Sequence, residues 1–254
     1  MDTSVLDLMH HHASVRHYKP DPVSSATIET IISAAQCAST SSNLQMYSVV
    51  VVTGASRREQ FADLCGNQAQ IREAPVFLVW CADLARLDRV CELRGYSQVT
   101  GYAENFLAAA VDVALLAQNA ALAAESLGLG ICYIGYIRNI IAETIGLLEL
   151  PRLTFPISGM TVGWPAKEPH SHPRLPLKAI LHWEKYNTNQ EMELHQYDRT
   201  MVETGLYHGR QVPAPGRPGI LEDYGWLEHS ARRVSKAERT GLCALLEKQG
   251  FGLK

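Results

Sequence analysis

One long alanine-rich helical pattern constrains the fold of this sequence more than any other feature. It runs from Glu104 to Leu127 and ends at Gly128, a residue type that commonly terminates helices. Polar side chains interrupt the apolar stretch at Asp112, Gln118 and Asn119. That interruption is typical of a buried helix in a soluble protein and argues against a membrane span. Because small side chains let helices approach closely, we expect this helix at a dimer interface; packing against the chain's own sheet is the alternative.

Short β-branched or apolar runs alternate with helical patterns along the first two thirds of the chain. Strands are expected at Tyr47–Val52, Val76–Cys81, Gly130–Ile134 and Ser158–Val162. Helices are expected at Ile28–Cys37 behind Pro22 and Ser24, at Ser56–Cys65 behind a capping box of Ser56 and Glu59, and after an Asn139 cap. The alternation predicts strands of a sheet separated by helices.

The composition excludes several classes of protein. At 254 residues and 46% hydrophobic content, the chain can bury a core without disulfides or metals. A net charge of -3 and scattered basic residues argue against a nucleic-acid partner. The six cysteines include no Cys-x-x-Cys pair, which favours free thiols in a reducing compartment. The amino-terminal segment lacks the basic and apolar regions of a signal peptide, so we expect a cytoplasmic protein.

From about Pro165 the sequence changes character and becomes rich in proline. Helices are expected near Gln190–Leu206 and Lys236–Gln249, with a Pro/Gly-rich loop at Gln211–Leu221 between them. Loops of this length are usually functional or disordered. We interpret 165–254 as an excursion that wraps the core or a partner subunit, so that residues 1–254 form a single domain.

Signatures of dinucleotide-binding, P-loop and hydrolase sites are missing from the sequence. No G-x-G-x-x-G, G-x-x-x-x-G-K-[ST], H-E-x-x-H or G-x-S-x-G motif occurs. The histidine run His10–His12 and the pair His170 and His172 have no further ligands at metal-binding spacing. We therefore expect no metal site.

The segment HHASVRHYKPDP, residues 11–22, is the strongest local candidate for a binding site. His12, Ser14 and Arg16 lie two residues apart, so an extended chain would point them to one side. A hydroxyl donor beside cationic donors suits a phosphate monoester. From the residues alone, a solvated charged loop at a helix end explains this pattern better.

Five motifs in a fixed order resemble the nitroreductase superfamily. They are HxSVRxY near the amino terminus, STSSNLQMYS at 39–48, GNQAQI at 66–71, AESLGLGICYIGYIRN at 124–139 and ISGMTVGWPAKEPHSHPRLP at 157–176. The tail motifs QYDRTMVE, GWLEHSARR and LLEKQGF have counterparts there as well. Each motif alone is weak. Together they cover essentially the whole chain and resemble the larger, NADPH-preferring branch of oxygen-insensitive nitroreductases and NADPH–FMN flavin reductases.

This resemblance implies an α+β fold with a mixed central sheet flanked by helices, an intertwined homodimer and a carboxy-terminal excursion. It also implies that FMN is bound. His12, Ser14 and Arg174 would hold the FMN phosphate, with His172 nearby, and Arg16 and Gln68 would face the pyrimidine edge of the flavin. The turn of Thr40, Ser41, Ser42 and Asn43 would lie near the ring or ribityl chain. The turn of Tyr133, Ile134, Gly135 and Tyr136 would offer backbone N–H groups toward N5 of the flavin.

Departures from the branch occur at three of the compared positions. Ala13 stands where the branch has arginine, Thr40 where it has serine, and His172 where it has lysine. The loss of two cations around the flavin bears on FMN affinity and reduction potential. For the nucleotide, the resemblance implies a flexible loop that supplies arginines to the 2′-phosphate of NADPH. His208 stands where an arginine is expected, so Arg210 or Arg217 would make this contact; a solvated loop is the alternative.

The function that the resemblance implies is ping-pong hydride transfer from NADPH through FMN to nitroaromatics, quinones or free flavin. The flavin carries the electrons, so no acid–base side chain is nominated as catalytic. Two alternatives stay open. The same scaffold could serve dehalogenation, azo or chromate reduction, or flavin supply to an oxygenase; a non-catalytic flavin-binding protein is the other.

Overall fold

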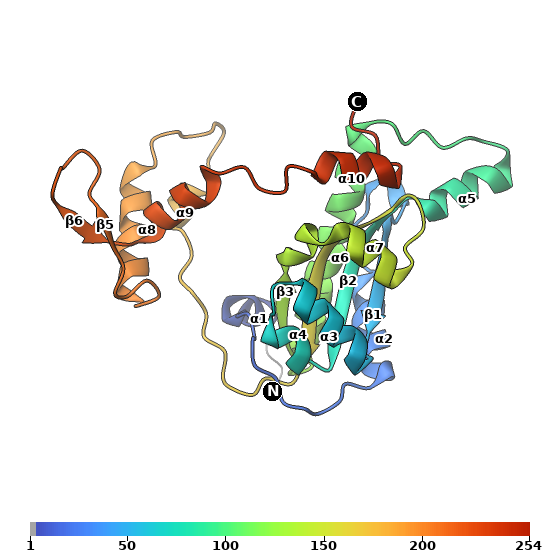
Figure 1. Ribbon diagram of the computed structural model, residues 1–254, viewed down its shortest axis with the longest axis horizontal. Helices are drawn as coiled ribbons and strands as arrows, with labels where there is room; N and C mark the ends of the chain where they lie inside the picture. The colour runs from blue at the N-terminus through green and yellow to red at the C-terminus, as the bar shows by residue number, and fades with distance from the viewer. Residues whose placement is uncertain (1–3) are drawn as a thin grey trace. The chain divides into compact units, whose positions relative to one another are not determined.

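The computed structural model describes residues 4–254 and separates into two compact units (Figure 1). Unit 1 comprises the residues up to Ser171 together with Arg239–Lys254, and unit 2 is His172–Glu238. The change of character expected near Pro165 thus falls a few residues before the boundary. That the whole chain forms one domain stays a prediction.

Unit 1 is built on a four-stranded sheet in the order β1-β2-β4-β3. The strands are β1 (Tyr47–Val52), β2 (Val76–Asp83), β3 (Gly130–Ile134) and β4 (Thr154–Gly163). All three strand pairs of this sheet are antiparallel, where the sequence predicted a mixed sheet. The α+β fold itself is confirmed.

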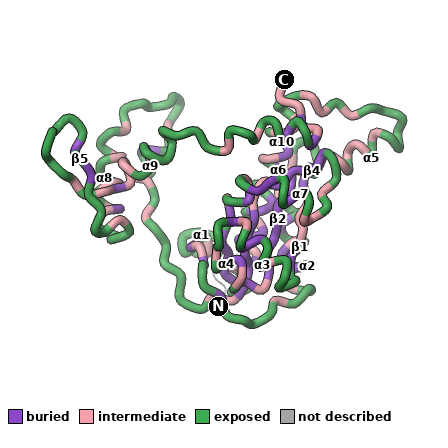
Figure 2. Tube along the Cα trace, viewed as in Figure 1, coloured by how far each residue is buried: buried purple, intermediate pink, exposed green. Residues whose placement is uncertain are grey.

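Strand β2 is buried along its whole length because both faces of the sheet are covered (Figure 2). Leu78 and Trp80 belong to one apolar core, and Phe77 and Val79 belong to the other. Successive side chains of a strand point to opposite faces, so a strand that lies between two cores reads as a continuous apolar run. This explains the sequence VFLVWC.

Helices form a layer on each face of the sheet. One core contains α2 (Ser25–Ala35), α6 (Ala103–Ser126) and α10 (Leu242–Gln249). The other contains α3 (Ala55–Leu64) and α4 (Ala69–Glu73), and α7 (Ile141–Leu148) contributes to both. The remaining elements of unit 1 are α1 (Val5–His11), η1 (Ser41–Asn43), α5 (Ala85–Arg94) and η2 (Gly135–Asn139).

Helix α6 is long and apolar enough to cross a membrane, by length and composition. Its buried residues pack toward α2 and the sheet, and they include the charged side chain of Asp112, which is 1% exposed. The helix therefore packs against the chain's own sheet on one side. Its opposite side leaves Leu107, Val111 and Leu115 exposed at a spacing of four residues.

Unit 2 consists of short elements. They are η3 (Leu177–Ala179), α8 (Glu191–Glu203), β5 (Gln211–Pro213), β6 (Leu221–Asp223) and α9 (Trp226–Val234). Asp198 on α8 accepts a hydrogen bond from the Leu227 backbone N–H at 2.8 Å, and the Tyr197 and Trp226 rings pack at 5.1 Å. These contacts join α8 to α9.

Several expected element boundaries are wrong in instructive ways. The loop predicted at 211–221 is a β-hairpin, in which Gln211 pairs with Asp223. The helix predicted from Lys236 begins only at Leu242, and α9 and α5 were not expected. Neither Ser56 nor Asn139 caps a helix, since α3 starts behind Gly54 and α7 behind Ile140. By contrast, the Ser24 side chain accepts a hydrogen bond from Thr27 N–H and caps α2 as predicted.

Candidate functional site

The predicted phosphate-binding segment lies beside the edge strand β3. The backbone N–H of Val15 donates to the carbonyl of Ile131 at 2.8 Å. A Cβ atom on Gly130 would collide with the Val15 side chain, so glycine is required for this close approach. Within this segment, the side chains of Ala13 and Val15 are buried. The alternating His12, Ser14 and Arg16 therefore lie on the more exposed side.

His12 is held by a carboxylate from α6. Its Nδ1 lies 2.6 Å from Oε1 of Glu125, whose side chain is 11% exposed. The other carboxylate oxygen, Oε2, is buried and has no hydrogen-bond partner among residues 4–254. Burial raises the pKa of Glu125, and the hydrogen bond and charge of His12 oppose the rise. Contact through Nδ1 leaves the Nε2 of His12 available for a ligand.

Ser14 and Arg16 lie near the buried thiol of Cys132 on β3. Burial raises the pKa of that thiol, while the Arg16 charge and the Ser14 hydroxyl oppose the rise. The Tyr133 pKa is also raised, by burial and then by the nearby Glu125 carboxylate. Within the described part of the chain, Arg16 has no ion-pair or hydrogen-bond partner. Its exposed guanidinium is therefore available to an anion.

The turn after β3 lies next to the α3–α4 connection. A Cβ atom on Gly66 would lie 3.3 Å from the Tyr136 ring, and Gly66 itself has a φ of +79°. Two residues later, Gln68 donates from Nε2 to the Cys65 carbonyl and accepts from Gln70 at Oε1. Arg138 ends the turn by donating to the Ile157 carbonyl at 3.0 Å. We call the residues brought to this side of the sheet the β3-edge group: His12, Ser14, Arg16, Gln68, Tyr133, Ile134, Gly135 and Tyr136.

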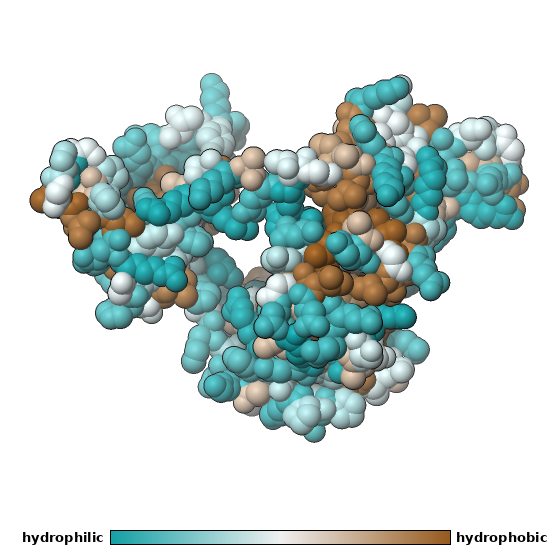
Figure 3. Space-filling view, viewed as in Figure 1, coloured by the Kyte–Doolittle hydropathy of each residue, from teal (hydrophilic) through white to brown (hydrophobic). Residues whose placement is uncertain are grey.

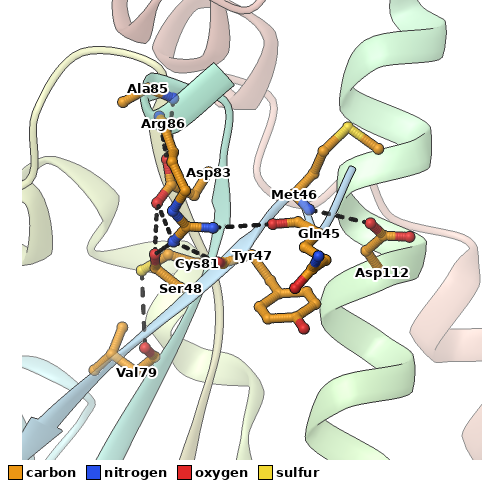
Figure 4. A network of polar contacts seen from close by, with 10 residues as sticks. All are labelled: Gln45, Met46, Tyr47, Ser48, Val79, Cys81, Asp83, Ala85, Arg86 and Asp112. Carbon is orange, nitrogen blue, oxygen red and sulfur yellow. Dashed lines mark hydrogen bonds and ion pairs between the residues drawn. The ribbon is translucent and has the colours of Figure 1, made fainter. Parts of the chain in front are cut away.

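The other predicted turn, Thr40–Asn43, lies at the opposite edge of the sheet, because it is part of a 40–46 turn that leads into β1. Strands β1 and β3 are the two edge strands, and three strand spacings separate them by roughly 14 Å. Asp112 of α6 accepts from the backbone N–H of Ser41 at 2.9 Å and of Met46 at 3.1 Å (Figure 4). The structure thus divides the predicted flavin contacts of unit 1 into two places.

The remaining candidates belong to unit 2. Arg174 donates from Nη1 to the carbonyl of His172 at 3.1 Å, and both side chains are exposed. Arg210 lies 5.8 Å from the centre of the Tyr224 ring, and Arg217 pairs with Glu222 at 3.0 Å. His208 and Arg210 precede the first strand of the hairpin, and Arg217 lies in the turn between its strands. All three are exposed.

The donor set of the β3-edge group suits FMN. A partly buried histidine, a hydroxyl and an unpaired guanidinium are donors for a phosphate and for an electron-rich ring edge. Two half-exposed tyrosines offer aromatic surface: Tyr133 is 37% exposed and Tyr136 is 40% exposed. The group therefore fits the cofactor that the sequence resemblance implied.

Sequence reasoning missed the side chains that hold these segments in place. Glu125 positions His12, Asp112 and Arg86 hold the 40–46 turn, and Arg138 closes the 133–136 turn. One signal was available, because Asp112 and Glu125 are acidic residues inside an apolar helix. A buried carboxylate needs hydrogen-bond donors, but their identity depends on contacts between distant segments.

Two family models match the chain and together cover most of it. The model described as "Nitroreductase family" matches residues 10–164. The model described as "Nitroreductase family, C-terminal domain" matches residues 172–254. The gap between them ends where unit 2 begins, and the second match also includes Arg239–Lys254 of unit 1.

Characterised proteins resemble the chain along its full length. An "Oxygen-insensitive NADPH nitroreductase" of Salmonella typhimurium is 36% identical over 249 residues, which cover 98% of each chain. A "CR(VI) reductase" of Pseudomonas sp. (strain G-1) is 38% identical over 98% of this chain and 100% of its own. The solved "NADPH:FMN oxidoreductase from Vibrio harveyi complexed with NAD+" superposes with a TM-score of 0.86, at 31% identity over 98% of this chain and 99% of its own.

Proposed function

Because the chain belongs to the nitroreductase family, we propose that it is an FMN-dependent oxidoreductase that takes electrons from NADPH. Its acceptors are nitroaromatics, quinones or free flavin. The observation that carries the proposal is the β3-edge group. It places His12, Ser14 and Arg16, whose guanidinium has no partner among residues 4–254, at the same sheet edge as the half-exposed Tyr133 and Tyr136. Such donors suit an anionic aromatic cofactor.

When bound, FMN supplies hydride transfer between NADPH and the acceptor. In our proposal His12 and Ser14 hold the phosphate, and Arg174 and His172 of unit 2 join them. Glu125 keeps Nδ1 of His12 occupied, so that Nε2 faces the ligand. Arg16 and Gln68 face the pyrimidine edge, where the guanidinium stabilises negative charge. No proton-transferring side chain is needed for this role.

A homodimer would bring the 40–46 turn of one chain and the β3-edge group of the other chain together. In one chain the 40–46 turn and the β3-edge group lie at opposite edges of the sheet. A flavin that uses both sets would therefore draw them from two chains. The exposed stripe of Leu107, Val111 and Leu115 on α6 supports this, because contiguous apolar surface marks interaction sites. Figure 3 shows apolar side chains gathered on unit 1 over the place where Figure 1 labels α6 and α7.

Unit 2 has the surface expected of an excursion that packs against a partner. Its buried apolar residues are few: Ala179, Tyr197, Met201, Val212 and Ala214. Large apolar side chains remain open, such as Trp183 at 79% and Tyr186 at 72% exposed. We propose that a partner subunit covers them and that residues 1–254 act as one domain in the dimer. All six cysteines are free thiols, which is consistent with our assignment to the cytoplasm.

The electron acceptor distinguishes our proposal from its alternatives. The relative from Pseudomonas is named for chromate reduction, so chromate is a second candidate acceptor. NADPH oxidation by the FMN-loaded protein should be measured with a quinone, a nitroaromatic, free FMN and chromate in turn. We expect the quinone and the nitroaromatic to support turnover. If none of the four acceptors supports NADPH oxidation, the protein is a non-catalytic flavin-binding protein.

A further inference from the structure

The turn that leads into β1 has a backbone that needs support. Ser42, Asn43 and Gln45 have φ values of 49°, 56° and 51°. Positive φ is uncommon for residues other than glycine, and three such residues within four positions are held only when surrounding contacts determine them. We call residues Ser41–Met46 the β1-edge turn. Its conformation places the polar side chains of Ser42 and Asn43 on the surface.

Asp112 holds the β1-edge turn from the side of α6. One carboxylate oxygen accepts from Ser41 N–H, and the other accepts from Met46 N–H. The two amides are the first and the last of the turn, so a single side chain fixes both ends. Asp112 is 1% exposed and pairs with no cation within the described residues. A carboxylate in such a place is stable only while these donors satisfy it.

Arg86 holds the same turn from the side of α5. Its guanidinium donates to the carbonyls of Gln45 at 3.1 Å and Tyr47 at 3.2 Å, and to the Ser48 hydroxyl at 2.9 Å. Asp83 accepts from Arg86 and from Ser48, and its other oxygen accepts from the Ala85 N–H at the start of α5. Figure 4 shows Asp112 and Arg86 approaching the chain around Gln45 and Met46 from different elements.

We infer that Asp112 and Arg86 are positioning residues that hold the β1-edge turn in the conformation that binds flavin. This inference rests on the proposed function, in which Ser41, Ser42 and Asn43 contact the ring or ribityl chain. Neither Asp112 nor Arg86 touches the flavin in this account. Both act by fixing the backbone of the turn. Without them the turn would sample other conformations, and only a fraction of the molecules would be in the conformation that binds flavin.

The inference predicts a pattern that separates these residues from the phosphate-binding set. Riboflavin shares the ring and the ribityl chain with FMN but has no phosphate. Loosening the turn should therefore weaken both flavins to the same degree. We expect Arg86→Met and Asp112→Asn each to raise both dissociation constants about tenfold, comparable to the loss of one charge-assisted hydrogen bond. Asparagine offers one acceptor oxygen where the turn needs two, and its amide group would face an N–H donor.

The experiment combines flavin binding with amide hydrogen exchange on the full-length protein. Apoprotein is prepared from the wild type, from both variants and from Arg89→Met, and the dissociation constants of FMN and riboflavin are measured by flavin fluorescence. Arg89 lies on α5 three residues after Arg86, and among residues 4–254 its side chain pairs only with Glu92. Arg89→Met therefore removes the same charge from the same helix without touching the turn. Because Arg86 is 53% exposed, Arg86→Met should keep its fold even if Asp112→Asn does not.

Three results together would support the inference. In Arg86→Met, amide exchange across residues 41–48 is faster and the affinities for FMN and riboflavin fall equally. In Arg89→Met, exchange rates and both affinities equal those of the wild type. Wild-type flavin affinity together with faster exchange would show that the turn is structural only and would overturn the inference. Unchanged exchange in the turn would overturn it as well, as would weakening of FMN alone. If the wild-type protein itself binds neither flavin, the proposed function fails and this inference fails with it.

Discussion

Glu125 is the residue at which burial and function conflict most clearly. Its side chain is largely buried, one oxygen holds His12, and the other has no hydrogen-bond partner in the described part of the chain. Burial raises its pKa, so the folded state favours the protonated form more than the unfolded chain does. By linkage, the stabilising contribution of this group is complete below its ordinary pKa and is lost as pH rises through the raised value.

We therefore expect Glu125→Gln to gain stability relative to the wild type as pH rises from about 4.3. The free energy of urea unfolding should be measured for both proteins from pH 4.5 to 7.5 at one protein concentration. Glu104→Gln, an exposed change at the start of the same helix, should follow the wild-type curve. Parallel curves for wild type and Glu125→Gln would refute the assigned environment.

Arg174 tests the phosphate assignment directly. Substitution by alanine removes a charge-assisted contact worth about 1.5–3 kcal/mol, or roughly 10- to 150-fold in affinity. The affinity for FMN should fall by that factor, while the affinity for riboflavin, which has no phosphate, should stay the same. Arg199 on α8 is also exposed and provides the matched control, Arg199→Ala. If FMN and riboflavin weaken equally, Arg174 does not bind the phosphate.

Among elements, those with a strong local pattern were predicted, whereas short elements and caps that depend on other contacts were not. Strand β2 followed from its apolar run, and α2 followed from the Ser24 cap. The hairpin of unit 2 was missed because its strands have three residues each, too few for a periodic pattern. Ser56 and Asn139 have the composition of caps, yet Asn139 accepts a hydrogen bond from Arg239, a hundred residues away.

The same division applies to the candidate site. The alternation of His12, Ser14 and Arg16 is visible in the sequence, since it depends on a local extended backbone. The supports of the site are not visible, because Glu125 and His12 lie 113 positions apart and Asp112 and Ser41 lie 71 apart. Only the folded chain brings those pairs together.

The hairpin Gln211–Asp223 is the element to which we assign nucleotide preference. Arg210 and Arg217 should bind the 2′-phosphate that NADH lacks. Each arginine should be changed to alanine in turn. In at least one of the two variants, kcat/KM for NADPH should fall at least tenfold, with little change for NADH. Glu222→Gln frees Arg217 from its ion pair and should not lower NADPH efficiency. The assignment fails if both arginine variants and the double variant keep the wild-type NADPH-to-NADH ratio.

At the scale of the whole molecule, the account requires two chains. Light scattering at micromolar concentration should give twice the 28.1 kDa of one chain. Val111→Lys places a charge in the exposed apolar stripe of α6 and should shift the protein toward monomer, with loss of FMN. Gln60→Lys, an exposed change on α3, is the control. A stable monomer that retains FMN would contradict the shared site.

The central claim is that this protein passes electrons from NADPH to bound FMN. The most direct test is an anaerobic titration of the purified protein with NADPH, followed by absorbance of the flavin. We predict a yellow protein with about one non-covalent FMN per chain, whose flavin absorbance is bleached by about one equivalent of NADPH. A protein that binds no FMN, or one whose bound FMN keeps its absorbance in excess NADPH, would contradict the account.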